Sequence, residues 1–141
     1  MVTFKSLSTP ENLNQMCVGT AISHMGIQFT HMTVDSITAE MPVDPRTIQP
    51  AGLLHGGCHA LLAETLAGIA SFLLLEGTQQ VPVGIEVTAK HVKSIKSGKI
   101  IGTVKAGHLG KRLHLWEIKI LNEKGDLLSM GTVTNQIIDK I

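Results

Sequence analysis

The strongest constraint on the fold is one long helical pattern, residues 57–76, which is followed only by strand patterns. Its large aliphatic side chains recur at the spacing of a single helix face: Leu62, Leu66, Ile69 and Leu73. Gly77 then occupies a position typical of the residue just beyond a helix C-terminus. A helix with one strongly apolar face needs a large apolar surface to cover it, and the strands must supply that surface.

The other segments predict an antiparallel sheet. Alternating segments rich in Val, Ile and Thr are residues 80–93, 99–106, 113–122 and 127–138. Hairpin-like turns separate them at 96–98, 107–110 and 123–126. Residues 26–30 and 33–41 form a predicted hairpin, and Thr9 caps a short helix from Pro10 to about Val18. We therefore predict an α+β fold in one domain, residues 1–141, with a curved antiparallel sheet of five to six strands around one long central helix.

Composition narrows the classes of partner. The net charge of +1 gives no reason to expect nucleic-acid binding. Hydrophobic residues make up 43% of the chain and charged residues 16%, so we expect surplus apolar surface to lie in a subunit interface. The first eight residues lack a signal-peptide pattern, and the apolar segment 61–75 is too short and too polar to span a membrane. Cys17 and Cys58 form no C-x-x-C pair, and a cytoplasmic location is predicted.

Candidate chemistry gathers in residues 49–64. Glu64 lies on the helix among small residues, where a ligand or another backbone has room: Gly57, Ala60, Ala67, Gly68 and Ser71. An ionised carboxylate in dry surroundings costs several kcal/mol unless something uses it. At the helix start, unpaired N–H groups and the positive end of the dipole favour an oxyanion hole at Gly56. Gln49 and His55 offer further hydrogen-bond donors beside it.

The spacing of these residues points to two subunits. Gly56 and Glu64 are eight residues apart, a rise of about 12 Å along one helix. One small substrate carbonyl cannot easily contact both within one chain. A two-fold axis that sets two such helices side by side and antiparallel would bring Glu64 of one chain to the helix start of the other. We therefore predict a homodimer with shared sites.

A longer pattern carries a family resemblance. Residues 41–57, which contain Gln49 and the His55-Gly56-Gly57 motif, are followed by Ala63-Glu64. This pattern resembles the hotdog-fold acyl-CoA thioesterases of the phenylacetic-acid-degradation type. Within them it is most similar to the bacterial dihydroxynaphthoyl-CoA and 4-hydroxybenzoyl-CoA thioesterase branch. The similarity covers essentially the whole chain, including residues 11–15, 84–87, 90–93, 108–110 and 116–118.

The resemblance implies a hotdog fold and hydrolysis of acyl-CoA thioesters to free acid and CoA. Aromatic acyl groups would be favoured, with 1,4-dihydroxy-2-naphthoyl-CoA of menaquinone biosynthesis as the expected substrate. Gly56 would polarise the thioester carbonyl, Gln49 and His55 would orient it, and Glu64 of the other subunit would be nucleophile or general base. The CoA thiolate leaves readily, so no metal and no cofactor are expected. The family assembly is a homotetramer of two such dimers.

The chain departs from the family pattern one turn after Glu64. The family usually has Ser or Thr there, which helps to hold the attacking water, whereas this chain has Gly68. Binding of the CoA phosphates is expected from two basic groups. These are His91, Lys93 and Lys96 at a strand end, and Lys111 with Arg112 in a later turn. An alternative interpretation is that they are solvated hairpin residues.

Two other functions remain open at this point. A hotdog dehydratase acting on acyl carriers is one, although Glu64 with the carbonyl-binding groups suits acyl transfer better. A non-enzymatic protein that binds or senses acyl-CoA is the other, and Gly68 keeps it open. Cys58 is expected to be a small buried residue rather than a nucleophile. Four histidines show no metal-ligand spacing: His24, His59, His108 and His114.

Overall fold

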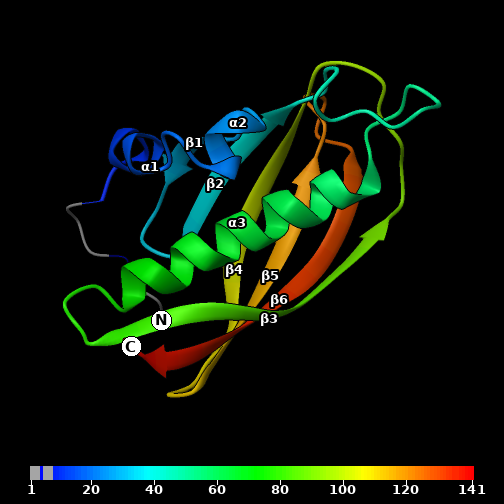
Figure 1. Ribbon diagram of the computed structural model, residues 1–141. Helices are drawn as coiled ribbons and strands as arrows, with labels where there is room; N and C mark the ends of the chain where they lie inside the picture. The colour runs from blue at the N-terminus through cyan, green and yellow to red at the C-terminus, as the bar shows by residue number, and fades with distance from the viewer. Residues whose placement is uncertain (1–3, 5–7) are drawn as a thin grey trace.

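The structure is a computed structural model that describes Phe4 and residues 8–141 (Figure 1). The helices are α1 (Pro10–Met16), α2 (Ala21–His24) and α3 (Gly56–Leu74). The strands are β1 (Gln28–Met32), β2 (Ser36–Pro42), β3 (Gln80–His91), β4 (Lys99–Leu109), β5 (Leu113–Leu121) and β6 (Leu127–Asp139). Most of the N-terminal segment in which we expected no signal peptide lies outside the described residues.

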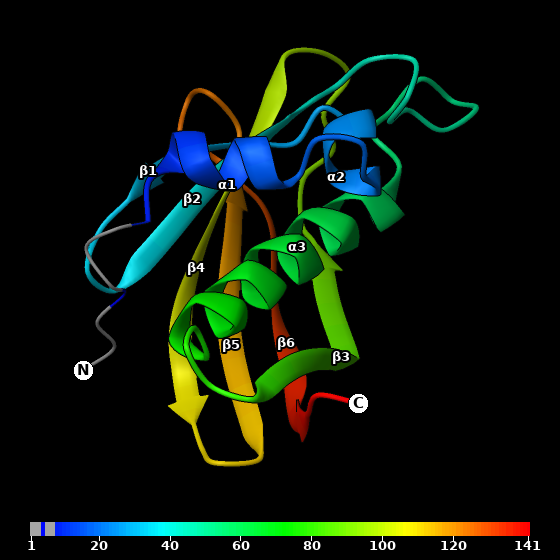
Figure 2. The same cartoon turned by 60° about the vertical axis from the view of Figure 1, so that its left-hand side comes forward.

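One six-stranded sheet curves around α3. The strand order is β1-β2-β4-β5-β6-β3, and every neighbouring pair is antiparallel. Figures 1 and 2 show α3 lying across the concave face of this sheet, with α1 beside β1. The predicted central helix and antiparallel sheet are confirmed. Among the described residues β3 pairs only with β6, so its outer edge has no strand beside it.

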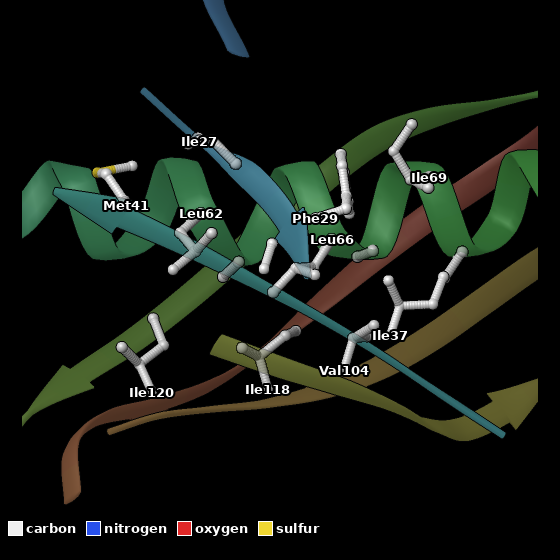
Figure 3. Close-up of a cluster of buried hydrophobic side chains, with 14 of the residues drawn as sticks. Ile27, Phe29, Ile37, Met41, Leu62, Leu66, Ile69, Val104, Ile118 and Ile120 are labelled. Atoms are coloured by element: carbon white, nitrogen blue, oxygen red, sulfur yellow. The ribbon is translucent and has the colours of Figure 1, made fainter. Parts of the chain in front are cut away.

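The apolar face of α3 anchors the helix on the sheet. Leu62 and Leu66 are fully buried, and Ile69 and Leu73 are also buried, which confirms the predicted face. Figure 3 shows this face of the helix against aliphatic side chains of β2, β4 and β5: Ile37, Met41, Val104, Ile118 and Ile120. Burying one such side chain contributes about 1.5–3 kcal/mol. This packing fixes where the helix start and Glu64 lie.

One polar cluster, centred on the Ser71 hydroxyl, interrupts the core. Trp116 Nε1–H and Asn135 Nδ2–H donate to Ser71 Oγ at 2.8 Å and 2.9 Å. These two bonds use both lone pairs of the oxygen, so the hydroxyl proton is donated to His114 Nδ1 at 2.9 Å. His114 therefore accepts at Nδ1, and burial lowers its pKa. The cluster ties α3 to β5 and β6.

Several element bounds differ from the sequence prediction, and one short helix was not predicted. The helix α3 ends at Leu74, and Gly77 has a positive φ of 82° three residues later. The short helix α2 was not predicted, because four residues carry too little periodicity. The turn predicted at 107–110 begins too early, since β4 continues to Leu109 across a bulge between Ala106 and His108. A bulge inserts one residue while pairing continues on both sides of it.

By length and composition alone, α3 is long and apolar enough to cross a membrane, with 19 residues and a mean hydropathy of 1.5. We expected this segment to be too short and too polar. The helix begins at Gly56, ahead of the apolar segment 61–75 on which that expectation was based. More than half of the helix is buried inside the fold, and packing on the sheet accounts for its apolar composition.

Candidate active site

The start of α3 presents His55 as a hydrogen-bond donor. His55 is the N-cap residue, and its Nδ1 accepts a hydrogen bond from Gly57 N–H at 2.8 Å. Its own N–H donates to Thr47 O at 2.8 Å, which fixes the residue in the loop. Because Nδ1 accepts, a neutral His55 ring carries its proton on Nε2. The exposed ring thus presents an Nε2–H donor at its outer edge.

Gln49 is prepared in the same way. Its side-chain Oε1 accepts a hydrogen bond from Ala51 N–H, and its backbone N–H donates to Leu53 O at 2.8 Å. These bonds close the turn before α3, in which Gly52 has a φ of 81° that favours glycine. With Oε1 occupied, the amide nitrogen Nε2 is the part of the side chain left to donate.

Gly56 has no room for a side chain. A Cβ atom there would lie 2.9 Å from Nε2 of His91, which reaches the helix start from the end of β3. His91 Nδ1 lies 2.9 Å from Ser129 Oγ, whose hydroxyl donates to Lys90 O at 3.2 Å. Ser129 therefore accepts from His91, and a neutral His91 aims its Nε2 lone pair at Gly56. As the first helical residue, Gly56 has no intrahelical acceptor for its N–H.

A cavity of about 310 Å³ lies at the helix start. Gln49, Gly56 and His91 contribute to its wall together with His59, which sequence reasoning had examined only as a metal ligand. The His59 ring stacks on His91 with 4.8 Å between ring centroids. Burial, with a smaller contribution from His91, lowers the pKa of His59 to about 4, so the ring is neutral. The sequence did contain a signal for the burial of His59. It lies three residues before Leu62 and seven before Leu66, which places it on the same buried face of the helix.

Glu64 lies in a different cavity. It lines a groove of about 530 Å³ with Gly68 and mainly apolar side chains, among them Leu61, Ile69 and Phe72. Its side chain is exposed in the single chain, so the dry surroundings we expected are absent. The predicted stripe of small residues is wrong in part, because Ala67 and Ser71 are fully buried on the sheet side.

The carboxylate of Glu64 rests against β3. A Cβ atom at Gly84 would lie 2.5 Å from Glu64 Oε1. Within one chain, Glu64 is therefore grouped with Gly68 and Gly84, whereas Gly56, Gln49 and His55 gather at the start of α3. The structure brings the three predicted carbonyl-binding residues together and leaves the predicted base in its own groove.

The two predicted basic groups are separated within one chain. Lys93 and Lys96 line a hollow of about 440 Å³ that also contains Lys99. Lys93 pairs with Asp126 at 2.7 Å. Lys111 and Arg112 follow the other end of β4, roughly 30 Å from Lys99 at the usual rise of a strand. His91 points to the helix start instead of this hollow.

Cys58 is buried, and its Sγ donates to Thr47 O at 3.5 Å. Burial raises the pKa of its thiol, which opposes formation of a thiolate, as expected for a structural cysteine. No group of three His, Cys, Asp or Glu side chains in the described part of the chain is arranged to hold a metal ion.

Residues 51–129 match the Thioesterase superfamily. The chain belongs to this superfamily. It is 43% identical over 135 residues to the 1,4-dihydroxy-2-naphthoyl-CoA hydrolase of Escherichia coli, across 96% of this chain and 98% of that protein. It is 44% identical over 122 residues to the proofreading thioesterase EntH of Cronobacter turicensis, across 86% and 88% of the two chains.

Solved thioesterase structures share the fold. Thioesterase HI1161 from Haemophilus influenzae superposes with a TM-score of 0.92 at 39% identity, over 99% of this chain and 96% of that one. A mutant of thioesterase PA1618 from Pseudomonas aeruginosa superposes with a TM-score of 0.94 at 34% identity, over 97% and 99%. The fold is the hotdog fold, and the protein is a thioester hydrolase, which favours hydrolysis over the dehydratase and non-enzymatic alternatives.

Proposed function

We propose that the protein hydrolyses aromatic acyl-CoA thioesters, with 1,4-dihydroxy-2-naphthoyl-CoA in menaquinone biosynthesis as its substrate. The main observation in support of this proposal is the groove beside Glu64, where this carboxylate lines a mainly apolar hollow of about 530 Å³. Ligand pockets are commonly of this size and combine apolar walls with a few polar groups. The similarity to the relative named for this substrate, across nearly the whole chain, supports the same choice.

We also propose that two chains share each site. Gly56 and Glu64 are separated by about 12 Å of helix and line separate cavities, so neither cavity is complete alone. The outer edge of β3 carries exposed Val83 and Ile85, and Phe72 of α3 is also exposed. A two-fold axis along this surface would cover these side chains and set Glu64 against the helix start of the second chain. We infer a homotetramer of two such dimers from the family resemblance, and a cytoplasmic location from the cysteine usage.

In this site the thioester carbonyl would accept hydrogen bonds from Gly56 N–H, Gln49 Nε2 and His55 Nε2. As general base, Glu64 takes a proton from water while the water oxygen bonds to the carbonyl carbon. The oxyanion then collapses, the C–S bond breaks, and the thiolate takes the proton from Glu64. As nucleophile, Glu64 would instead displace the thiolate and form an anhydride that water cleaves.

Single turnover in ¹⁸O-labelled water separates the two roles of Glu64. The general-base route places the label in the product acid in the first turnover. The anhydride route allows water to attack the glutamyl carbon, which leaves label in the enzyme. Mass spectrometry of the peptide that contains Glu64 measures the difference.

For CoA, we propose that Lys93 and Lys96 bind the phosphates near the hollow they line and that His91 contacts the adjoining pantetheine arm. Lys111 and Arg112 would contribute only from another subunit, because they follow the far end of β4. Lys93→Ala with Lys96→Ala should raise KM for an acyl-CoA and leave KM for the matching acyl-pantetheine unchanged. Equal effects on both substrates would remove the phosphate assignment.

The substrate proposal is tested with a panel of aromatic, short aliphatic and long aliphatic acyl-CoAs, with released thiol as the readout. We expect the highest kcat/KM for the aromatic esters, and faster turnover of an aliphatic ester would contradict the proposal. Glu64→Ala should lower kcat by at least ~10³-fold. Glu86→Ala, which removes an exposed carboxylate on β3 instead of the one on α3, is the matched control and should retain activity.

Mixed dimers test the shared site. His55→Ala and Glu64→Ala proteins are each expected to be inactive, but a mixed dimer contains one site with both changes and one with neither. Random pairing makes about half the dimers mixed, so about a quarter of all sites should regain wild-type composition. Recovery toward that fraction supports the arrangement. A mixture that stays inactive, with mixed dimers demonstrated by mass spectrometry, assigns both residues to one chain.

A further inference from the structure

Two oxygen atoms from different elements converge near Gly84. The position of a Cβ atom on Gly84 is 2.5 Å from Glu64 Oε1 of α3 and 3.6 Å from Asn135 Oδ1 of β6. Because both distances start from one point, the two oxygens lie within about 6 Å of each other. Two acceptors that share one water are about 5 Å apart, since each O–H···O bond is about 2.8 Å long. At any separation below about 5.6 Å, which is twice that bond length, a single water can bond to both oxygens.

The orientation of the Asn135 amide is fixed by its partners. Its Nδ2 donates to Ala67 O at 3.0 Å and to Ser71 Oγ at 2.9 Å. A carbonyl oxygen only accepts, so the amide cannot be turned over, and Oδ1 must face Gly84. Asn135 is 1% exposed, yet no described residue donates a hydrogen bond to this oxygen. In the described part of the chain, His59 Nδ1 is the only fully buried side-chain N or O atom without a partner, so Asn135 Oδ1 keeps contact with solvent. A solvent-accessible amide oxygen accepts a hydrogen bond from water.

The chemistry of an attacking water requires a second acceptor. One lone pair of the water approaches the carbonyl carbon, and one proton passes to the base. The other proton needs an acceptor to fix the orientation of the molecule, and fixing it is a large part of the catalytic gain. Gly68, one turn after Glu64, offers no side chain, and nothing lies within 4 Å of where its Cβ would be. Asn135 Oδ1 is an acceptor beside Glu64 to which no described residue donates.

We propose that Asn135 Oδ1 and Glu64 together hold the water that attacks the thioester, so that Asn135 is a further catalytic residue of this chain. Throughout the step the water donates one hydrogen to Asn135 Oδ1. It gives the other to Glu64 as its oxygen bonds to the carbonyl carbon, and the departing thiolate finally takes that proton. This inference rests on the proposed general-base role of Glu64. Asn135 on β6 would thus accept the hydrogen bond from the water, which Gly68 on α3 cannot do because it has no side chain.

The test is rescue of one variant by another. Asn135→Leu removes the acceptor while it keeps a side chain branched at the same carbon, and it should lower kcat for an aromatic acyl-CoA by about 10–100-fold, with KM within about threefold. Adding Gly68→Ser to this variant supplies a hydroxyl one turn from Glu64 and should restore at least about fivefold in kcat. Gly68→Ala is the matched control, since it adds the same Cβ without an acceptor, and should restore nothing.

Several outcomes would overturn the inference. These are a kcat of Asn135→Leu within threefold of wild type, or equal effects of Gly68→Ser and Gly68→Ala in that background. If the variant does not fold, a high-resolution crystal structure of the wild-type dimer decides. A water within hydrogen-bond distance of both Glu64 and Asn135 Oδ1 supports the proposal, and no water on Asn135 Oδ1 rejects it. Failure of the general-base role itself is seen separately, as normal turnover by Glu64→Ala.

Discussion

Gly84→Ala tests whether Glu64 works from the position it occupies against β3. The added methyl group would lie 2.5 Å from Glu64 Oε1 and 3.5 Å from its carboxylate carbon. The oxygen must move away by about 1 Å to reach an ordinary van der Waals distance. A displacement of this size in an active site costs about 10²-fold, so kcat should fall by about that factor. Stability should change by less than about 1 kcal/mol, because the obstacle is the flexible end of an exposed side chain and alanine restricts the unfolded chain.

The assay measures kcat and KM for one aromatic acyl-CoA, together with urea unfolding of the same preparations. Gly107→Ala is the control, since it also adds a methyl group to a strand glycine but meets nothing closer than 3.4 Å. We expect wild-type kcat from this control. A Gly84→Ala protein that folds normally and keeps wild-type kcat would refute the reasoning, because catalysis would not depend on this placement of the carboxylate.

Three further changes address the core and the helix start. Ser71→Ala should destabilise the fold by about 2–4 kcal/mol in urea unfolding, because Trp116 Nε1 would lose its buried acceptor. His59 has a folded pKa of about 4 against about 6.5 unfolded, so acid favours the unfolded state. Stability should fall by up to about 3 kcal/mol between pH 6.5 and pH 4, and His59→Phe should remove this part of the loss. Gly56→Ala should lower kcat at least about tenfold, because its methyl group would meet His91 Nε2 at 2.9 Å.

The main elements of the fold could be predicted because their signals are local. The 4-3-4 spacing of aliphatic residues identified the buried face of α3, and alternating Val, Ile and Thr identified β3 to β6. Chain order does not specify strand order, however. The strand β3 follows α3 directly and yet joins the far edge of the sheet beside β6, a pairing set by tertiary packing.

The grouping of candidate residues at the helix start could be predicted for the same reason. Gln49, His55 and Gly56 are close in sequence and lie together at the helix start. His59 and His91, however, are far apart in sequence, and their stacking depends on how β3 crosses the start of α3. The approach of Glu64 and Asn135 to Gly84 joins three elements, and no local pattern marks it.

The regular alternation of side chains along a strand would predict that Gly84 and His91 of β3 face opposite sides of the sheet. Gly84 and His91 are seven residues apart, so a regular strand would turn them to opposite faces. Both nevertheless face α3, because Gly84 pairs with Asn135 and Glu86 with Thr134, which leaves Ile85 as one extra residue in a bulge. The bulge resets the alternation between them.

Two single-residue deletions test this account of β3. Removing Ile85 takes out the unpaired residue and leaves every pairing with β6 unchanged, so Gly84 and His91 still face α3 and the urea midpoint should change little. Removing Thr88 shortens the strand between the bulge and His91 by one residue, so one of two structural changes must follow. Either His91 turns outward, or the bulge disappears and Glu86 turns toward the core, where an unpaired carboxylate costs several kcal/mol. We expect the Thr88 deletion to lower the unfolding free energy far more than the Ile85 deletion. Equal losses would mean that the bulge has no part in setting which side chains of β3 reach the helix.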